Sequence, residues 1–340
     1  MKALQIIEGN QLELIDMDMP SISPHHVMLK VMAVSICGTD VHQWEGKTPT
    51  PLPRIPGHDF AGIVEEVGPA VDGFKAGDRV AVRPSLPCYQ CRACAAGFYE
   101  GCPNTKLMGL FSDGCFREYM AIPESNLISL PDNVTFEAAS VLEPFTVGLN
   151  AFRKLSINIG ETIAILGAGP IGLGVIRIAG IAGAGRVYAI DIRSEALAIA
   201  TEFGATDVID LSTEEGRKAH DKLKERKTDI VIETAGASAT VAMIPGLVRK
   251  GGRIVNIGIV QGIGAVPTEE IVRFALTVIG VGGNGGKGKY VTAIDLAARG
   301  IIDPERLITH TFPFEKAIEA FEVARDKPEG TIKVAVVAQA

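Results

Sequence analysis

The cysteines of this 340-residue chain are unevenly spaced, and their spacing indicates a metal site. Four of the six follow the pattern C-x2-C-x2-C-x7-C: Cys88, Cys91, Cys94 and Cys102. Thiolates bind zinc at about 2.3 Å in a tetrahedron, and closely spaced ligands surround one ion at little cost in loop entropy. Because four cysteines leave no open position, we expect a structural zinc rather than four free thiols. A zinc ribbon for nucleic acid usually has two separated C-x2-C knuckles instead.

A glycine-rich segment has the spacing of a dinucleotide-binding turn. Gly167-Ala168-Gly169-Pro170-Ile171-Gly172 reads G-x-G-x-x-G, and it lies between a predicted strand and a predicted helix. Gly167 permits a tight turn, Gly169 lets the backbone approach a pyrophosphate, and Gly172 permits close helix–strand packing. The free N–H groups of the helix N-terminus favour phosphate binding. We expect Pro170 and Ile171 to belong to this site.

An acidic residue follows at the distance that a dinucleotide fold requires. Asp191 ends the next predicted strand, where a carboxylate accepts hydrogen bonds from ribose hydroxyls and repels a 2′-phosphate. This favours NAD over NADP. Arg193 lies two residues later and can accept a 2′-phosphate, stack on adenine or face solvent, so it weakens the preference. Three residues near later predicted strands complete the expected cofactor site: Ile257, Gly258 and Val281.

Cys37 and His58 lie outside the cysteine cluster, and their neighbours favour a second metal site. Glycines precede His58 and follow Cys37, which allows the backbone to approach a bound group closely. Thr39 and His42 place a hydroxyl and an imidazole two and five residues after the thiol. Such a pair can carry a proton from a buried alkoxide to solvent.

These motifs, in this order, resemble the zinc-containing medium-chain dehydrogenases/reductases over essentially the whole chain. The resemblance implies a GroES-like catalytic domain, a Rossmann domain and a cleft between them. It also implies a catalytic zinc held by Cys37, His58 and an acidic residue, with one position open to water or substrate. We therefore expect two zinc ions per chain and NAD. Zinc-free quinone reductases of the superfamily lack the Cys37 and four-cysteine elements.

The third protein ligand of the catalytic zinc stays open between two residues. The family usually has Gly-His-Glu, whereas this chain has Gly57-His58-Asp59, one methylene shorter at the acid. Asp59 can bind zinc directly or leave that role to Glu143, which precedes Pro144. The Glu-Pro pair resembles the polyol and threonine dehydrogenase branches, where the glutamate lies at or next to the zinc. Glu143 is otherwise a carboxylate at a helix start.

The pattern of strand-type and helical segments along the sequence predicts two domains that position these residues. Short β-type runs separated by glycine and proline extend to about residue 150, followed by apolar strands that alternate with helical stretches. Continuous Val/Ile/Ala strands joined by helices are typical of a doubly wound parallel sheet. We expect an α/β protein with a discontinuous GroES-like β-rich catalytic domain, 1–148 and 283–340, and a Rossmann domain, 149–282.

Composition excludes several function classes. The net charge is −7 and the sequence pI about 5.5, whereas nucleic acid or an anionic membrane attracts a basic surface. The first residues lack the apolar region of a secretion signal, so we expect a cytoplasmic protein. We expect a small-molecule alcohol as partner, and a homo-oligomer, tetramer or dimer, by resemblance. The apolar segment 275–283 could pair with its equivalent in a second copy.

We expect zinc to lower the pKa of a secondary alcohol, which then donates hydride to NAD. In this hypothesis Thr39 takes the alcohol proton and passes it through the NAD ribose to His42. A polyol or sugar alcohol, including phosphorylated forms, ranks first as substrate, L-threonine second and a vicinal diol such as 2,3-butanediol third. Trp44 and Phe111 are candidate pocket residues, although aromatic residues in β-rich domains more often belong to the core. A non-catalytic relative is expected to lose Thr39, His42 or a zinc ligand, and this chain keeps them.

Overall fold

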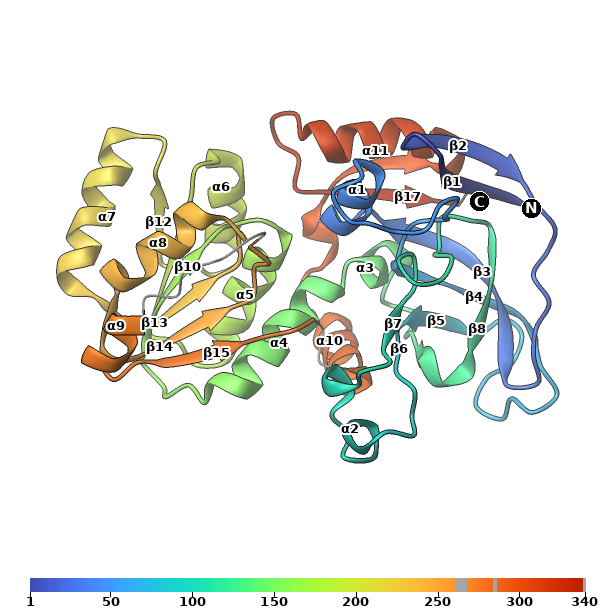
Figure 1. Ribbon diagram of the computed structural model, residues 1–340, viewed down its shortest axis with the longest axis horizontal. Coiled ribbons are helices and arrows are strands. Elements are labelled where there is room, and N and C mark those ends of the chain that lie inside the picture. The colour runs from blue at the N-terminus through green and yellow to red at the C-terminus, as the bar shows by residue number, and fades with distance from the viewer. Residues whose placement is uncertain (261–267, 284–285, 339–340) are drawn as a thin grey trace. The chain divides into compact units, whose positions relative to one another are not determined.

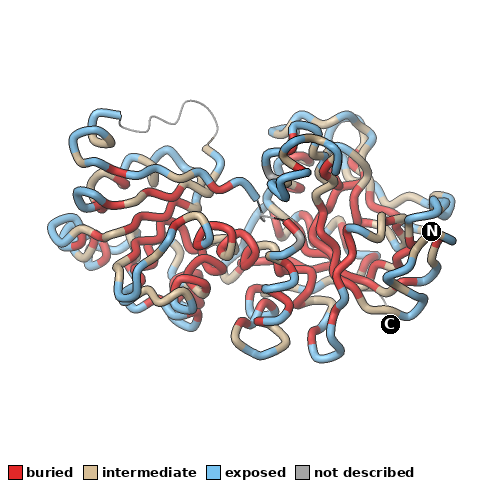
Figure 2. The backbone as a smooth tube through the Cα atoms, turned by 90° about the horizontal axis from the view of Figure 1, so that it is seen from below, coloured by how far each residue is buried: buried red, intermediate tan, exposed pale blue. Residues whose placement is uncertain are grey.

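The computed structural model describes residues 1–260, 268–283 and 286–338, and it divides into two compact units (Figure 1). The first unit comprises Met1–Leu142 and Gly286–Ala340, and the second comprises Glu143–Gly285. In both units the buried residues concentrate in the strands and in the helix faces that pack on them (Figure 2). Within the described residues, none of the helices is both long and apolar enough to cross a bilayer.

The first unit is built on a seven-stranded sheet in the order β16-β17-β3-β4-β5-β9, with β8 also paired to β3. These strands are β3 (His26–Ser35), β4 (Asp59–Val67), β5 (Arg79–Val82), β8 (Tyr119–Pro123), β9 (Leu127–Ser129), β16 (Ile308–Pro313) and β17 (Lys333–Val337). Two small hairpin sheets join β1 (Lys2–Ile7) to β2 (Gln11–Asp16) and β6 (Ser85–Leu86) to β7 (Lys106–Leu107). The C-terminal β17 pairs antiparallel with β3, so both ends of the sequence contribute to one sheet.

Short helices fill the connections of this unit. They are α1 (Gly38–Trp44), α2 (Arg92–Ala95), α3 (Phe136–Ser140), α10 (Lys287–Ala298) and α11 (Ala317–Asp326). Short 3-10 turns occupy Tyr99–Gly101, Glu124–Asn126, Glu305–Leu307 and Phe314–Lys316. The apolar face of α11 packs on the sheet, and its Phe321 is wholly buried against Phe116 and Trp44. Trp44 therefore lies in the core contact of α1 and α11, which agrees with the core interpretation of this tryptophan.

The second unit is a six-stranded parallel sheet covered by helices. The sheet order is β12-β11-β10-β13-β14-β15. Its strands are β10 (Thr162–Leu166), β11 (Arg186–Asp191), β12 (Asp207–Asp210), β13 (Thr228–Glu233), β14 (Val248–Asn256) and β15 (Thr277–Gly280). Numbered along the unit this is the order 3-2-1-4-5-6, which defines the Rossmann fold and confirms the predicted doubly wound sheet.

The helices of the second unit connect successive strands of its sheet, except α4, which precedes the first strand, β10. They are α4 (Glu143–Leu155), α5 (Pro170–Ile181), α6 (Ser194–Glu202), α7 (Glu214–Arg226), α8 (Ser238–Leu247) and α9 (Thr268–Arg273). The central strand β10 is apolar and buried at four successive positions, as expected for a strand with helices on both faces. By contrast β15, at one end of the strand order, is largely exposed. The predicted pairing of this segment with a second copy remains a prediction.

Candidate metal and dinucleotide sites

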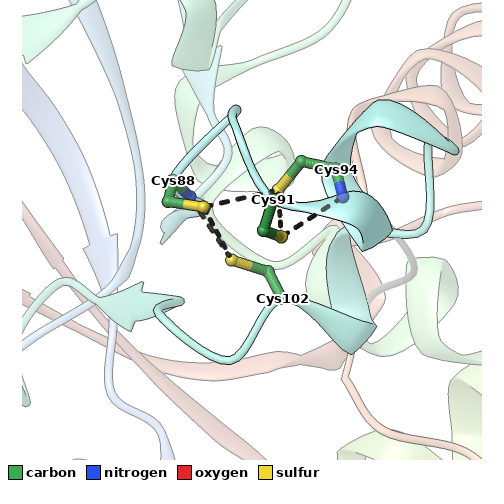
Figure 3. A group of neighbouring side chains, drawn as sticks. All are labelled: Cys88, Cys91, Cys94 and Cys102. Carbon is green, nitrogen blue, oxygen red and sulfur yellow. Dashed lines mark hydrogen bonds between the residues drawn. The ribbon is translucent and has the colours of Figure 1, made fainter.

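The four clustered cysteines converge in the loop between β6 and β7, with their sulfur atoms facing one another (Figure 3). The Sγ–Sγ distances are 3.5 Å for Cys91–Cys94, 3.6 Å for Cys88–Cys102 and 4.0 Å for Cys88–Cys94. Zinc–sulfur bonds of about 2.3 Å in a tetrahedron require sulfurs about 3.8 Å apart. The spacing of these thiols therefore fits one zinc ion with four sulfur ligands and no open position.

Backbone N–H groups surround the same sulfurs. The Cys88 N–H donates to Cys102 Sγ at 3.4 Å, and the Cys94 N–H donates to Cys91 Sγ at 3.5 Å. Such donors favour a thiolate, and the N–H of Cys88 is the main cause that lowers the pKa of Cys102 to about 6. Desolvation and the neighbouring sulfurs raise the pKa of Cys94 to about 12. The loop thus supplies donors for negative charge on sulfur before any metal is bound.

A second group that could hold a metal ion joins Cys37, His58 and Asp59, whose ligand atoms lie within 4.8 Å of one another. Cys37 follows β3 and caps α1, while His58 precedes β4 and Asp59 begins it. The two strands are antiparallel partners, with Ser35 opposite Asp59. Sheet pairing therefore brings together ligands that lie about twenty residues apart in the sequence. Soft sulfur, imidazole nitrogen and a carboxylate oxygen form a donor set that zinc accepts.

Asp40 ties the two segments of this cluster together. Its Oδ2 accepts a hydrogen bond from the Cys37 N–H at 2.8 Å, and its Oδ1 accepts one from the Gly57 N–H at 3.0 Å. Oδ1 also lies 3.4 Å from Nδ1 of His58. Asp40 is wholly buried, so these contacts form in a low-dielectric setting where charge–dipole interactions are strong. Asp40 therefore orients both the thiol and the imidazole.

The electrostatics of His58 follow from its surroundings. Burial lowers the pKa of this imidazole, but the charges of Asp40, Asp59 and Cys37 together raise it well above the ordinary histidine value. A negative environment of this kind also favours a bound cation. Gly57 has a φ of +95°, and a Cβ there would lie 2.8 Å from the Cys115 sulfur, so only glycine fits before His58. Cys115 is itself fully buried.

Asp59 has one engaged and one unengaged oxygen. Its Oδ2 lies 3.3 Å from Nζ of Lys333, and both side chains are buried. Its Oδ1 is buried and has no hydrogen-bond partner within the described part of the chain. A buried carboxylate oxygen without a partner is costly, and a cation at the cluster would satisfy it. This oxygen is therefore available to a metal ion held together with Cys37 and His58.

Three further residues predicted from the sequence lie on helices, two on α1 and one on α4. Thr39 is in α1, with its hydroxyl 3.7 Å from the Cys37 sulfur. His42 is in the last turn of the same helix and is exposed. Glu143 is the first residue of α4, in the second unit. Phe111 is 65% exposed in the loop after β7.

The glycine-rich segment forms the turn between β10 and α5. Gly167 has a φ of +101°, and a Cβ at Gly172 would lie 2.0 Å from the Gly167 carbonyl oxygen, so neither position tolerates a side chain. Gly169 is the N-cap of α5, and nothing lies within 4 Å of its Cβ position. Pro170 begins the helix, and Ile171 follows it in the first turn. The N-terminus of α5 is thus preceded by open space, as phosphate binding requires.

Asp191 connects the end of β11 to this turn. Its Oδ2 accepts a hydrogen bond from the Ala168 N–H at 2.6 Å, and its Oδ1 accepts bonds from the N–H groups of Ile192 and Arg193. Nε of Arg193 lies 3.6 Å from Oδ1. The carboxylate therefore fixes the glycine turn in addition to offering negative charge beside it.

The remaining predicted cofactor residues lie at the same edge of the sheet. Ile257 and Gly258 follow β14, and both of their N–H groups donate to the Glu233 carbonyl at the end of β13. Val281 follows β15, and its N–H donates to the Asn256 carbonyl at 3.0 Å. The carboxyl ends of the strands of a doubly wound sheet are where ligands bind.

Comparison with known proteins agrees with both halves of this arrangement. An alcohol dehydrogenase GroES-like domain model matches residues 23–132, and a zinc-binding dehydrogenase model matches residues 170–299. Sorbitol dehydrogenase from Bacillus subtilis strain 168 is 32% identical over 359 aligned residues, which cover 99% of this chain and 97% of that protein. This chain belongs to the zinc-binding alcohol dehydrogenase family. As a member of this family it is an oxidoreductase that acts on a small-molecule alcohol.

Two solved structures of Escherichia coli proteins show the same fold as this dehydrogenase over its full length. Galactitol-1-phosphate dehydrogenase aligns with a TM-score of 0.90 at 31% identity and covers 99% of this chain and 100% of that one. An alcohol dehydrogenase from strain CFT073, complexed with NADH, aligns with a TM-score of 0.91 at 30% identity and covers 99% and 98%. The GroES-like and Rossmann assignments are therefore confirmed.

Two residues that contact the Cys37 cluster, Asp40 and Lys333, were not predicted from the sequence. Asp40 lies within the Cys37-Gly38-Thr39-Asp40 motif, and its position three residues into α1, where a carboxylate can reach back to the Cys37 N–H, was an available signal. Lys333 lies 274 residues from Asp59 and carries no local motif. Only the pairing of β17 with β3 brings it near the cluster.

Proposed function

We propose that this dehydrogenase oxidises a secondary alcohol of the polyol or sugar-alcohol class to a ketone, with zinc and NAD as cofactors. The observation that carries the proposal is the convergence of Cys37, His58 and Asp59 within 4.8 Å, with an unpartnered carboxylate oxygen among them. When bound, the zinc supplies a Lewis acid that lowers the pKa of the alcohol, and the dinucleotide supplies the hydride acceptor.

We propose Asp59 as the third protein ligand, in preference to Glu143. Asp59 belongs to the described cluster and presents its free Oδ1 there, while Lys333 holds the other oxygen. Three ligands leave one of the four positions of a tetrahedral zinc for substrate, as in catalytic zinc sites generally. Zinc counts of Asp59→Asn and Glu143→Gln test this choice. We expect the Asp59 variant to hold about one zinc per chain and the Glu143 variant about two.

The residues of α1 supply the proton path in this proposal. The Thr39 hydroxyl lies beside the Cys37 sulfur and can accept the proton of an alcohol held at the open position. His42, one turn further along the same helix and exposed, can deliver that proton to water. Asp40 fixes the position of α1 relative to the cluster, because it accepts hydrogen bonds from the Cys37 and Gly57 N–H groups.

The dinucleotide preference rests on Asp191. Its carboxylate uses part of its acceptor capacity on three backbone N–H groups and retains its negative charge beside the glycine turn. That charge favours the two ribose hydroxyls of NAD and repels the 2′-phosphate of NADP. The Arg193 guanidinium lies on the Asp191 carboxylate, so we propose that it pairs with the acid instead of accepting a phosphate.

The substrate class is proposed from the likeness to sorbitol and galactitol-1-phosphate dehydrogenases together with the Glu143-Pro144 pair. In both named substrates the hydroxyl that reacts has polar neighbours. A metal with an open position and a carboxylate ligand accommodates such a second oxygen.

A substrate panel tests the function. The zinc-loaded protein is assayed with NAD and with NADP on sorbitol, galactitol, galactitol 1-phosphate, L-threonine and 2,3-butanediol. We expect kcat/KM to be highest for a polyol or its phosphate and higher with NAD. Activity on threonine alone would refute the substrate class, and equal activity before and after removal of all zinc would refute the zinc-dependent reaction.

A further inference from the structure

Arg83, which directly follows β5, is an unusual buried charge. Its side chain is only 1% exposed, and it is among the largest fully buried side chains of the protein. Its single described side-chain hydrogen bond runs from Nη2 to the Tyr89 hydroxyl, whereas Nε and Nη1 have no partner. Among the described residues no carboxylate pairs with it. Burial of an unpaired guanidinium destabilises the fold, so other interactions of Arg83 must offset this cost.

Arg83 is surrounded by the aromatic residues of the four-cysteine loop. Its guanidinium carbon lies 5.8 Å from the ring centroid of Tyr89 and 5.5 Å from that of Tyr99. The two rings meet edge to face, with centroids 5.9 Å apart. A cation on aromatic faces is attracted by the ring quadrupole, most strongly where water is excluded. Arg83 thus fastens both rings to the end of β5.

Tyr89 lies directly inside the metal-binding knuckle, between Cys88 and Cys91. Its φ is +57°, a left-handed conformation that residues with a side chain other than Asn or Asp rarely adopt. The contact with Arg83 therefore holds a residue of unusual backbone conformation in the turn between Cys88 and Cys91.

Tyr99 contacts the last cysteine of the cluster, Cys102, through its backbone. Its carbonyl oxygen accepts hydrogen bonds from the Cys102 N–H at 3.1 Å and from the Thr105 hydroxyl at 3.4 Å. The position of the Tyr99 ring against Arg83 thus fixes the short turn that delivers Cys102 to the other three sulfurs. One arginine contacts the two aromatic residues that set the first knuckle and the last ligand.

We propose that Arg83 is a positioning residue for the four-cysteine zinc centre, acting through Tyr89 and Tyr99 and offsetting the charge of the centre. Zinc with four thiolates has two negative charges in excess, and a buried cation nearby stabilises this anion. Arginine suits the role better than lysine because its flat guanidinium packs on two rings while it donates to a hydroxyl. In this proposal the negative charge of the metal centre balances the positive charge of the buried Arg83 guanidinium.

The test measures zinc release from the full-length, zinc-loaded protein into the chromophoric chelator 4-(2-pyridylazo)resorcinol. The phase from the four-cysteine site is identified as the one that Cys102→Ser removes. We expect Arg83→Met to accelerate this phase by about tenfold and Arg83→Lys to accelerate it less, since loss of a desolvated cation–π contact has about that effect. Tyr89→Phe, which keeps the ring but removes the hydroxyl, should accelerate it by a few fold.

A matched control lies on the same strand. Arg79 also covers an aromatic ring, that of Phe136 at 4.5 Å, and it has no described contact with the four-cysteine loop. Arg79→Met should therefore release zinc at the wild-type rate. Release from Arg83→Met at the wild-type rate would overturn the proposal, as would equal acceleration by the two variants.

Thermal unfolding separates positioning of the metal from packing alone. The midpoint of Arg83→Met should fall further below wild type in the zinc-loaded protein than in the metal-free protein. Equal falls in both states would mean that Arg83 only fills space, and would overturn the proposal. If Arg83→Met does not fold, Tyr99→Leu with Arg83 intact takes its place, and its four-cysteine phase must accelerate for the proposal to stand.

Discussion

The two metal clusters of this dehydrogenase are built by opposite routes. The four-cysteine centre takes all of its ligands from one short loop, 88–102, and hydrogen bonds within that loop orient the sulfurs. The Cys37 cluster needs the register of β3 on β4 and the buried Asp40 between them. A local cluster can form as soon as its loop closes around a metal, whereas the distributed cluster exists only in the folded sheet.

The ligand chemistry differs in the same sense. Four thiolates saturate a zinc ion and leave it with excess negative charge, which suits a structural role. The Cys37 cluster offers two negative charges, from a thiolate and a carboxylate, together with a neutral imidazole. These would balance the two positive charges of Zn²⁺ and leave its fourth coordination position free. A zinc ion held in this cluster would lower the pKa of a bound alcohol more than a zinc ion with four thiolate ligands would, because fewer anionic ligands would offset its charge. The difference supports the proposal that the four-cysteine centre is structural and that the Cys37 cluster is catalytic.

The largest effect should come from removing the thiolate of the distributed cluster. Cys37→Ser should lower kcat/KM by about a thousandfold, because Lewis-acid stabilisation supplies several kcal/mol, or about 4 kcal/mol for that factor. The zinc content should fall from about two to about one per chain. Steady-state NAD reduction and metal analysis of the purified variant check both numbers.

The reciprocal change separates the two centres. Cys102→Ser should also leave about one zinc per chain, yet kcat of the folded protein should stay within a few fold of wild type. The thermal midpoint of the first unit should instead fall by about 6–12 °C, the shift that ~3 kcal/mol produces in a domain of about 150–250 residues. A large loss of kcat in Cys102→Ser with an unchanged midpoint would reverse the assigned roles.

The contrast also explains what the sequence could predict. The C-x2-C-x2-C-x7-C spacing and the 167–172 turn are local, so residue types and intervals were sufficient to place them on a loop and at a strand–helix junction. The alternation of apolar strands and helices predicted the Rossmann sheet, because parallel strands buried on both faces must be continuously apolar. These features depend on residues that are neighbours in the sequence, so they can be predicted without knowledge of the fold.

The distributed cluster was predictable only in part. Cys37 and His58 were found from their flanking glycines and from family resemblance, but no local pattern chooses between Asp59 and Glu143. That choice depends on the free Oδ1 of Asp59 and on its pairing with Lys333, both products of long-range strand pairing. Lys333 lies in an apolar terminal strand, where its charge gave no indication of a partner so distant in the sequence.

The next effect concerns this buried ion pair. Lys333→Met leaves the Asp59 carboxylate buried without its cation, so the free energy of unfolding of the metal-free protein should fall by about 3 kcal/mol. The zinc-loaded protein should lose less, because the metal replaces the missing positive charge. Lys333→Arg, which keeps a cation, serves as control. Chemical denaturation with and without zinc measures the two losses, and equal losses would mean that Asp59 does not bind the metal.

A smaller effect probes the proton path. Thr39→Val keeps the shape of the side chain but removes the hydroxyl beside Cys37, so kcat should fall by about a hundredfold. Thr39→Ser should retain most of the activity, since it keeps the hydroxyl. Zinc content should stay at about two per chain in both variants, in contrast with Cys37→Ser. Comparable activity of the Val and Ser variants would exclude Thr39 from proton transfer.

The smallest effect should come from lengthening the carboxylate ligand. Asp59→Glu restores the residue usual in the family and keeps the charge, so we expect kcat/KM to stay within about tenfold of wild type, or about 1.4 kcal/mol. The cost should be geometric, because the added methylene must fit between Lys333 and the metal position. The double variant Asp59→Glu with Lys333→Arg changes both partners and provides the cycle that measures their coupling. If the effects of the two single variants on kcat/KM simply add in the double variant, Lys333 does not act through Asp59. Of the two contacting residues, only Asp40 would then support the three ligands.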